Sequence, residues 1–589
     1  MPHDPDIHCS HEEGIAYRGG VYRPLDHAAL PECPRTADFP DPGAGPPLRR
    51  VDEVPRVPRL RDVIGPSVIA LGMGLGAGEF LLWPDLIAVN GFSIWWLFWI
   101  GVLTQFVVIG EIERWSIATG ESVFSGMARL SRVPFWPWFF LAATLASFFW
   151  PGWAAQSADF TRLTVNALLG REVLTHWQPI ALAMMVFIWC ALAISRIVYN
   201  ALETFEILLV LLFFPLLLVA LLFAGILPGD VAALAEGAVS IGSVPPDLLS
   251  GEQFPTLLIA VAYAGSGGTL LLAQSLWVRD KGFGMGSHQG RIAGIRGANE
   301  PVSESGFAFP ASDAVARARF RGWMRLAERE LLVTFVVLII LSVVITTLLV
   351  AATVGTNRPD LAGKLNELVQ AQAAILRARG GAWLEVVFLL GGAMVLFSTQ
   401  VGIVDTVTRI TGDIFHDRVG RARGLTLKSI FLALLTVVVL ASIAVIVASW
   451  IAGESVDALQ PDFLVLIAGP FTITSMYAFA VVVAILNTRH LPLALRMPRW
   501  KLVGMYWAVV LWGWFTAETI SRVILSQVLG LSGSDVTTIS WHPVRWVVYG
   551  AWIVSLAWLV ARTFGPGILR RPAPPGPTPS SVVPPGASG

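Results

Sequence analysis

The chain has 589 residues, of which 55% are hydrophobic and only 14% are charged, and its mean hydropathy is +0.66. A soluble domain carries about 25% charged residues, so this composition excludes a soluble globular protein and indicates a helical protein that crosses a membrane many times. The formal net charge is zero, and we expect no nucleic-acid partner. The cysteines Cys9, Cys33 and Cys190 show no CxxC spacing, so neither a disulfide framework nor a structural zinc site is indicated.

Taken in chain order, residues 1–60 are polar and proline-rich, with no apolar core near Met1. We expect a disordered cytoplasmic tail there and no cleaved signal peptide. Apolar stretches of about 20 residues follow, the length that a helix needs to cross hydrocarbon. We predict twelve spans, at residues 62–89, 93–115, 135–160, 178–195, 203–227, 253–278, 330–354, 382–408, 427–451, 463–487, 503–528 and 542–563. Residues 564–589 are rich in Pro, Gly and Ser and predict a second disordered tail.

Glycines interrupt the first and sixth predicted spans. The first contains Leu71-Gly-Met-Gly-Leu-Gly-Ala-Gly-Glu79, and the sixth contains Ala262-Tyr-Ala-Gly-Ser-Gly-Gly268. Broken spans at corresponding places in two halves are typical of the binding site of a secondary transporter. They predict a transporter core at 61–488, with inverted repeats at about 62–227 and 253–488 and a cytoplasmic loop at 280–328. Residues 489–563 would then form two additional transmembrane helices.

The predicted fold class is therefore an all-α integral membrane protein. It has about 12 transmembrane helices, arranged as a 5+5 inverted repeat with broken helices 1 and 6, plus two extra helices. Lys and Arg gather after spans 6, 8 and 10, between residues 279–329, 418–428 and 489–501, whereas the loops after spans 1, 5 and 9 carry none. Positive loops stay in the cytoplasm, so both termini are expected to be cytoplasmic.

Glu79 is an acid at membrane depth, where an ionisable side chain is costly and usually functional. It could bind a cation or a coupling proton. It could also be an N-terminal acid that accepts hydrogen bonds from the free N–H groups of the second half of a broken helix. The two interpretations are compatible.

The alternating glycines of the first span, Gly72, Gly74, Gly76 and Gly78, allow two interpretations as well. They permit an unwound stretch whose carbonyls line a cavity, or they permit close packing between helices. The same choice applies to Gly265, Gly267 and Gly268. Beside them, Ser266 and Thr269 are candidate hydroxyl ligands, and Tyr263 either lines the site or packs.

Other polar groups in the spans have simpler explanations. Asp405 with Arg409 and Glu518 with Arg522 are acid–base pairs at i,i+4 spacing, which we interpret as local neutralisation. Ser398, Thr399 and Gln400 of the eighth span are candidates for binding a coupling ion. The sequence contains no GxxxxGK[ST], HExxH or GxSxG motif, so we expect neither an enzyme nor a bound cofactor.

Two segments carry a family resemblance: residues from Gly65-Pro-Ser67 to Gly91-Phe92, and Arg114-Trp-Ser-Ile-Ala-Thr-Gly120. They resemble the Nramp family of proton-coupled divalent-metal transporters, which implies a leucine-transporter-type fold in the cell membrane. The family's metal-binding Asp-Pro-Gly-Asn motif falls on residues 76–79, so that Gly76 replaces the Asp and Glu79 replaces the Asn. The family's Met-Pro-His motif falls on residues 266–268, where Ser266 replaces the Met. The soft sulfur that favours manganese or iron is therefore absent.

Together these features predict an Nramp-like secondary transporter that moves a divalent cation across the lipid bilayer by alternating access, with a proton as the expected coupling ion. The expected binding residues are Gly74, Gly76, Ala77, Glu79, Tyr263, Ala264, Gly265, Ser266 and Thr269. Among these, Glu79, Gly76 and Ser266 are the expected metal ligands, and the coupling ion is assigned to Glu79, Ser398, Thr399 and Gln400. An amino-acid or other small organic solute transporter of the same fold, or a non-transporting sensor or scaffold, remains an alternative, and the sequence gives no oligomeric state.

Overall fold

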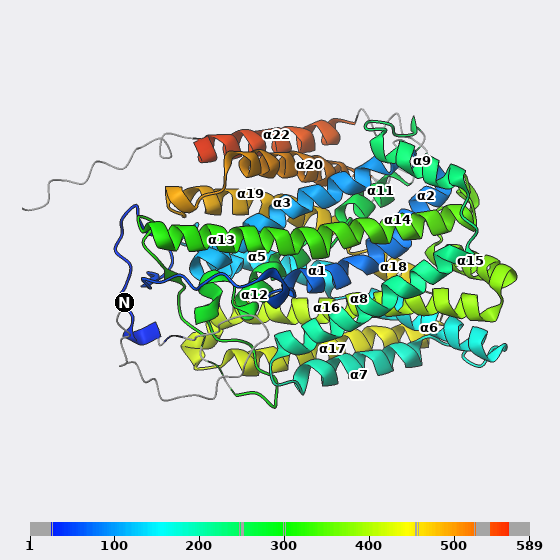
Figure 1. Ribbon diagram of the computed structural model, residues 1–589, viewed down its shortest axis with the longest axis horizontal. Helices are drawn as coiled ribbons and strands as arrows, with labels where there is room; N and C mark the ends of the chain where they lie inside the picture. Colours follow the sequence, from blue (N-terminus) through cyan, green and yellow to red (C-terminus); the bar gives the residue numbers. More distant parts are fainter. Residues whose placement is uncertain are drawn as a thin grey trace, which may run out of the picture.

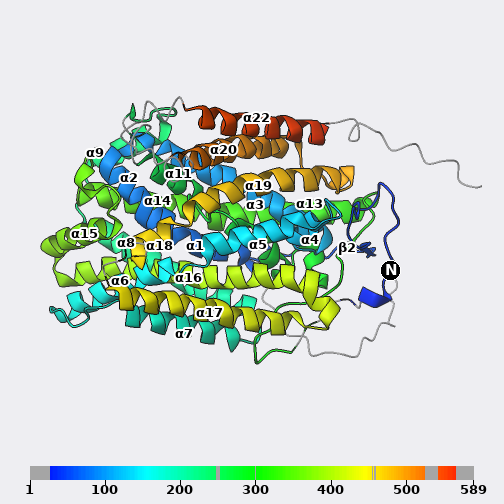
Figure 2. The ribbon, with the colours of Figure 1, turned by 180° about the vertical axis from the view of Figure 1, so that it is seen from behind.

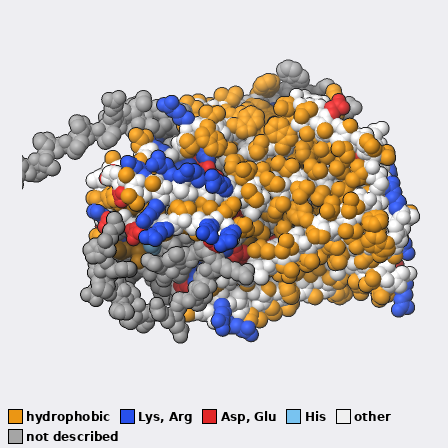
Figure 3. All heavy atoms as spheres, in the orientation of Figure 1, with side chains coloured by type: hydrophobic (Ala, Val, Ile, Leu, Met, Phe, Trp, Pro, Cys, Tyr) orange, Lys and Arg blue, Asp and Glu red, His pale blue; other side chains and the backbone are white. Residues whose placement is uncertain are grey.

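The computed structural model describes residues 25–564 except 26, 247, 249–252, 299, 301, 454–455, 457–458, 524 and 526–541. Residues 1–24 of the predicted tail at 1–60, and residues 565–589 of the predicted tail at 564–589, lie outside these described residues. Long helices run side by side along the longest axis of the molecule (Figures 1 and 2). The flank between the two ends is covered by apolar side chains, while Lys and Arg gather at the end that bears the N-terminal segment and, in a second group, at the opposite end (Figure 3). This distribution suits a protein surrounded by lipid.

Nine helices in the described part of the chain are long and apolar enough to span a membrane. The other predicted spans correspond to α7, to the pair α11 and α12, and to α20, so the all-α membrane fold class is confirmed. The principal helices are α1 (Pro66–Gly74), α2 (Trp83–Asn90), α3 (Trp96–Thr119), α4 (Val123–Ala128), α5 (Phe135–Phe148), α6 (Gly152–Leu169), α7 (Gln178–Ala193), α8 (Val198–Phe223), α9 (Pro228–Val239), α11 (Phe254–Ala262), α12 (Leu270–Lys281), α13 (Ala314–Glu330), α14 (Val337–Ala352), α15 (Leu365–Gly380), α16 (Ala382–Phe415), α17 (Leu427–Ala452), α18 (Pro461–Leu466), α19 (Gly469–Arg489), α20 (Arg499–Val523) and α22 (Pro543–Phe564).

The two glycine-rich spans differ in backbone conformation. In the sixth span α11 ends at Ala262 and α12 begins at Leu270, and the residues between them are not helical, as predicted. In the first span α1 passes through the π-helix η3 (Leu75–Leu82) into α2 without leaving a helical path. The predicted unwinding of the first span is therefore replaced by a change of helical pitch, a π-helix of the kind that is frequent at functional sites.

The N-terminal segment departs from the disordered tail predicted for residues 1–60. Within it, β1 (Arg49–Arg50) pairs in parallel with β2 (Phe307–Ala308), which lies in the loop predicted at 280–328. Phe39, Leu48 and Val54 are buried. Residues 27–60 therefore fold against this loop, because backbone pairing and a few apolar anchors stabilise a segment that its polar composition alone would leave unfolded.

The first span lies in the middle of the molecule. It packs against α8 and α16 on one side and against α12, α14 and η6 (Leu331–Val336) on another. Every residue of α1 is buried, whereas α22 packs on α20 and α19 at the periphery and exposes much of its apolar surface. This arrangement surrounds the glycine-rich stretch of the first span with polar groups from several helices.

Candidate functional site

Glu79 is directed from η3 toward the sixth-span break, which comprises residues 263–269. Its Oε1 accepts a hydrogen bond of 2.8 Å from the backbone N–H of Gly265. Its Oε2 has no partner among the described residues, its side chain is fully buried, and no Lys or Arg of the described chain forms an ion pair with it. A buried carboxylate without a positive partner is unfavourable, so this geometry favours a bound cation or a proton on Glu79.

Glu79 does not accept hydrogen bonds at the N-terminus of α2, the helix that follows it, as the alternative interpretation expected. The residue before α2 is Leu82, and no side chain accepts a hydrogen bond at that end of the helix. Glu79 instead accepts from Gly265, whose N–H follows the last turn of α11. The acid of the first span thus satisfies the backbone of the sixth span and ties the two spans together.

Gly265 has a φ of 112°, a conformation that only glycine adopts readily. A Cβ at this position would lie 2.6 Å from Cζ of Phe335 and 2.7 Å from Oε1 of Gln105. The sixth-span break is therefore tightly packed and leaves no room for a side chain at Gly265. The free carboxylate oxygen of Glu79 and the amide oxygen of Gln105 both lie next to this glycine.

Gln105 of α3 is a site residue that the sequence reasoning missed. Its Nε2 donates to the carbonyl of Ala262, 3.0 Å away, at the end of α11. Its Oε1 is buried and has no partner among the described residues. The signal was present in the sequence as an amide within an otherwise apolar stretch of the second span. The site thus contains two unpartnered oxygen acceptors, which are the groups that a cation needs.

The predicted hydroxyl and phenol ligands surround the break, but each is engaged by protein. Ser266 Oγ donates to the carbonyl of Ala70, Thr269 accepts from Thr144 at 2.9 Å, and the hydroxyl of Tyr263 lies 3.2 Å from Oγ1 of Thr472. In this state they therefore join the break to its neighbours. Coordination by any of them requires one of these hydrogen bonds to be exchanged.

α14 adds two hydroxyls that the sequence reasoning also missed. Thr346 Oγ1 donates to the backbone carbonyl of Glu79 at 2.7 Å. One helical turn earlier, Ser342 is buried, and its hydroxyl has no partner among the described residues. Thr346 therefore holds the backbone that carries the acid.

The four alternating glycines of the first span form two pairs at i,i+4 spacing. Gly74 and Gly78 face the sixth span: a Cβ on Gly74 would lie 2.9 Å from the backbone carbon of Gly265, and one on Gly78 would overlap the carbonyl of Tyr263. Gly72 and Gly76 face away, toward side chains of α8 and α16. The glycines of the first span therefore permit close packing between helices and do not mark an unwound stretch.

The three coupling-ion candidates of α16 point to different partners. Ser398 donates to Glu206 of α8, and Thr399 Oγ1 donates to the carbonyl of Gly72 at 3.2 Å. The amide oxygen of Gln400 accepts from the backbone N–H of Ala154 at 3.0 Å, on α6. Consecutive helical residues diverge around the axis, so Ser398 and Thr399 face the first span while Gln400 faces the third.

The two i,i+4 acid–base pairs are present, each with additional partners. Asp405 accepts two hydrogen bonds of 2.9 Å from Arg409, which also pairs with Asp280 of α12. Glu518 pairs with Arg522 and with Arg545. These charges neutralise one another, as the sequence interpretation has it.

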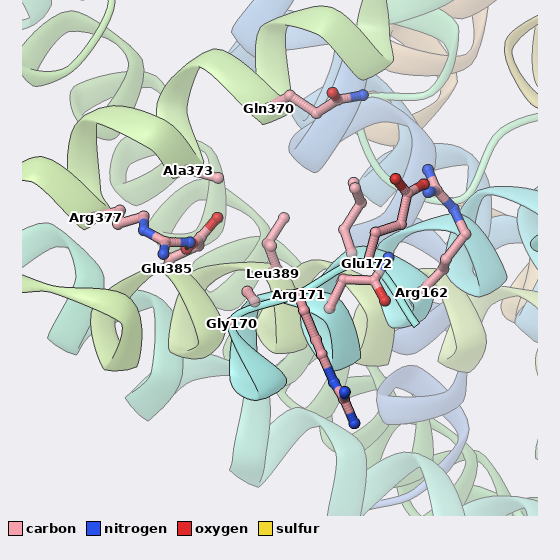
Figure 4. Close-up of a pocket in the computed structure, with 12 residues that line it drawn as sticks. Arg162, Gly170, Arg171, Glu172, Gln370, Ala373, Arg377, Glu385 and Leu389 are labelled. Atoms are coloured by element: carbon pink, nitrogen blue, oxygen red, sulfur yellow. Dashed lines mark hydrogen bonds and ion pairs between the residues drawn. The ribbon is translucent and has the colours of Figure 1, made fainter. Parts of the chain in front are cut away.

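The centre of the site is closed to solvent, since Glu79, Ser266 and Thr269 expose at most 1% of their surface. A separate pocket of about 390 Å³ opens at the end opposite the N-terminal segment, between α6, α15 and α16. In Figure 4 the Arg377 guanidinium lies against Glu385, at an ion-pair distance of 2.9 Å, while Arg171 extends away from the pocket. Among the described residues no three His, Cys, Asp or Glu side chains cluster in a way that could hold a metal. A metal at Glu79 would therefore rely on neutral oxygens for its other ligands.

No protein-family model and no curated protein sequence matches the chain. Its structure is similar to that of a variant of the manganese transporter of Eremococcus coleocola, with a TM-score of 0.57 and 13% identity, over 85% of this chain and 94% of that one. The same transporter in complex with an aromatic bis-isothiourea compound gives a TM-score of 0.57 at 12% identity, with the same coverage. MhsT in complex with L-phenylalanine is more distant, with a TM-score of 0.46 at 14% identity over 78% of this chain and 97% of that one. At these identities the likeness concerns the fold alone, and the chain has an all-α membrane fold similar to that of the manganese transporter.

Proposed function

We propose that this protein is a secondary active transporter that moves a divalent cation by alternating access and holds it between η3 and the sixth-span break. The observation that carries the proposal is the fully buried carboxylate of Glu79, whose Oε2 has no partner among the described residues and lies beside the break. We further propose that the protein lies in the cell membrane with both termini in the cytoplasm, because Lys and Arg concentrate in the even-numbered loops.

The available ligands are oxygens. Glu79 Oε2 and Gln105 Oε1 are unpartnered among the described residues, and Ala264 lies in the non-helical break. Gly76 lies in the π-helix η3 and faces α16, so its carbonyl would have to leave the helical hydrogen-bond pattern to bind an ion. Met73 provides the sulfur closest in sequence, but its Sδ accepts a hydrogen bond of 3.4 Å from Thr406, toward α16. Oxygen ligands suit a hard ion such as Mg²⁺, which retains several of its waters when bound.

The close contact between the spans favours an ion over a larger solute. Gly74 and Gly78 bring the first span against the backbone of the sixth, so that even a methyl group would collide there. One observation favours the second candidate, a small organic solute with an amine: the site offers a single acid, and an ammonium group needs only one. Binding of both substrate classes, divalent cations and amino acids, is therefore compared in a stabilisation assay.

The test uses the purified full-length protein reconstituted in liposomes. Uptake of Mg²⁺ and of Mn²⁺ is measured for the wild type, for Glu79→Gln and for Asp85→Asn. Asp85 is the matched control, because it is a buried acid of the same span that also has one hydrogen-bonded and one unpartnered carboxylate oxygen among the described residues, but it accepts from the backbone N–H of Gly363 instead of facing the break. We expect uptake by the wild type and by Asp85→Asn, and its loss in Glu79→Gln.

Thermal stabilisation of the same samples separates the two substrate classes. Stabilisation by Mg²⁺ or Mn²⁺ that disappears in Glu79→Gln supports the cation proposal. Stabilisation by amino acids alone would replace it with the organic-solute alternative. Unchanged cation uptake by Glu79→Gln would show that Glu79 is not part of the cation-binding site.

A further inference from the structure

A second buried carboxyl lies on the opposite face of the first span. Glu206 of α8 is fully buried. Its Oε2 accepts a hydrogen bond from Ser398 of α16, and its Oε1 has no partner among the described residues. A Cβ on Gly72 would overlap Glu206 Oε2, so only a glycine allows the carboxyl group to lie directly against the first span.

The charged groups around Glu206 are paired with one another. On α8 itself, Glu203 pairs with Lys281 of α12 at 2.5 Å, and Tyr199 lies beside that pair. α1, α7 and α14, which all pack on α8, contain no Asp, Glu, Lys or Arg. The other helices that pack on α8 are α12, α15 and α16. Their charged residues near Glu206 are Asp405, Arg409 and Asp413 of α16 and Arg279 and Asp280 of α12. Their charged residues at the far end of the molecule are Glu385 of α16 and Glu367, Arg377 and Arg379 of α15.

Arg409 is the positive group of α16 in this region, and it is shared between Asp405 and Asp280. Arg279 pairs with Asp413 at 2.8 Å. Within the described chain no positive side chain forms an ion pair with Glu206. An ionised carboxylate in this position would be buried with one hydrogen bond and no counter-charge, which is strongly unfavourable.

We propose that Glu206 binds a proton in this closed state and releases the proton when the first span moves. As a neutral acid, its carboxyl group shares one hydrogen bond with Ser398 and needs no counter-charge. When Gly72 withdraws and water enters, the O–H bond of the acid breaks, the proton passes to water, and a hydrated carboxylate remains. The role of this site in coupling rests on the proposed transport function, while its protonation does not.

The surroundings suit a proton better than a metal ion. Thr399 directs its hydroxyl to the carbonyl of Gly72, and Met73 Sδ accepts from Thr406. Among the described residues, the Ser398 hydroxyl is the only group that forms a hydrogen bond with the Glu206 carboxyl group, and the two groups together offer three oxygens. Three oxygens are fewer than a magnesium or calcium ion takes.

Infrared difference spectroscopy of the purified full-length protein at neutral pH tests the proton site without any cargo. The carbonyl stretch of a protonated carboxyl group is expected in the wild type and should lose amplitude in Glu206→Gln. The matched control is Glu203→Gln, three residues earlier on the same helix, whose carboxylate is paired with Lys281 and should contribute nothing to this band. Equal band amplitude in the wild type and Glu206→Gln would overturn the proposal.

Ser398→Ala provides a second readout if Glu206→Gln does not fold. Removal of the hydroxyl frees the Glu206 carbonyl from its hydrogen bond, so the same band should shift to higher frequency with its amplitude retained. A spectrum identical to the wild type would contradict the assignment.

A transport arm then tests coupling separately. Mn²⁺ uptake into liposomes is measured with and without an inward proton gradient. Stimulation by the gradient in the wild type, and its loss in Glu206→Gln with downhill uptake preserved, is the expected result. Stimulation that persists in Glu206→Gln would overturn the coupling role. If the wild type takes up no cation at all, the proposed cargo fails, while the infrared result still decides the proton site.

Discussion

The first and sixth spans carry similar glycine-rich sequences but fold differently. In the sixth span Gly265 and Gly268 have φ values of 112° and 67°, and helical structure is lost between α11 and α12. In the first span the glycines remain helical, and each allows another group to approach closely. Glycine content thus permits both outcomes, and the neighbouring groups decide between them.

The difference assigns complementary roles to the two spans. The sixth provides exposed backbone groups, and the first provides the acid that binds one of them, at Gly265. Because the first span remains continuous from α1 to α2, it can move as one piece relative to its neighbours. It carries polar contacts on both faces, with Glu79 toward the break and Gly72 against Glu206. This is the geometry in which two sites could be linked by one moving element.

The largest expected effect is that of Gly265→Ala. Alanine at a positive φ costs about 1–2 kcal/mol, and a Cβ only 2.6 Å from Phe335 adds a further cost of about 1–3 kcal/mol by overpacking. Thermal unfolding in detergent should show a large loss of stability. The control is Gly170→Ala, which has a φ of 64° but open space around it and should show the strain cost alone. Equal losses in the two variants would mean that the break is not tightly packed.

An intermediate effect is expected from Gly78→Ala, because its Cβ would overlap the carbonyl of Tyr263. Backbone cannot move aside as a side chain can, so the two spans must separate, at a cost of about 1–3 kcal/mol. Gly412→Ala in α16 is the control within a helix. There the nearest atom to a Cβ is Cδ1 of Leu434 at 3.9 Å, an ordinary van der Waals contact, and the gain in helix propensity should leave the melting temperature unchanged or higher. A Gly78→Ala variant as stable as wild type would show that the two spans are not in close contact at this position.

The smallest effects concern α14. Thr346→Val removes the hydrogen bond to the carbonyl of Glu79 and should cost about 0.5–1.5 kcal/mol of unfolding free energy. Ser342→Ala removes a hydroxyl without a partner among the described residues and should leave stability within about 0.5 kcal/mol of the wild type. Chemical denaturation of the two variants gives the comparison. A larger loss for Ser342→Ala would show that its hydroxyl has a bound partner, such as a water or an ion.

Much of the architecture could be predicted from the sequence because spans are defined by length and apolar character. The bounds of α17, residues 427–452, match the predicted 427–451 closely. The break in the sixth span was predictable from Gly265 and Gly268. The continuity of the first span was not, because it depends on what packs against each glycine from α8, α14, α16 and the sixth-span break, and these contacts join residues far apart in the chain.

The site was predictable in part for the same reason. Glu79 stands out as an acid in an apolar, glycine-rich stretch, and its contact with Gly265 links the two predicted segments. Gln105 and Glu206 were visible as polar residues within spans, but nothing local distinguishes them from amides and acids that are paired elsewhere. Their unpartnered oxygens are a property of the assembled helices. Conversely, Gln400 looked suitable beside Ser398 and Thr399, and only the helical path shows that it faces α6.

The central claim is that Glu79 binds the transported cation between the two spans. Equilibrium titration of Mg²⁺ and Mn²⁺ into the purified full-length protein by calorimetry tests it most directly, with Glu79→Gln and Asp85→Asn titrated in parallel. We predict saturable binding to the wild type and to Asp85→Asn, and no binding to Glu79→Gln. Binding of equal affinity and stoichiometry to Glu79→Gln would contradict the claim.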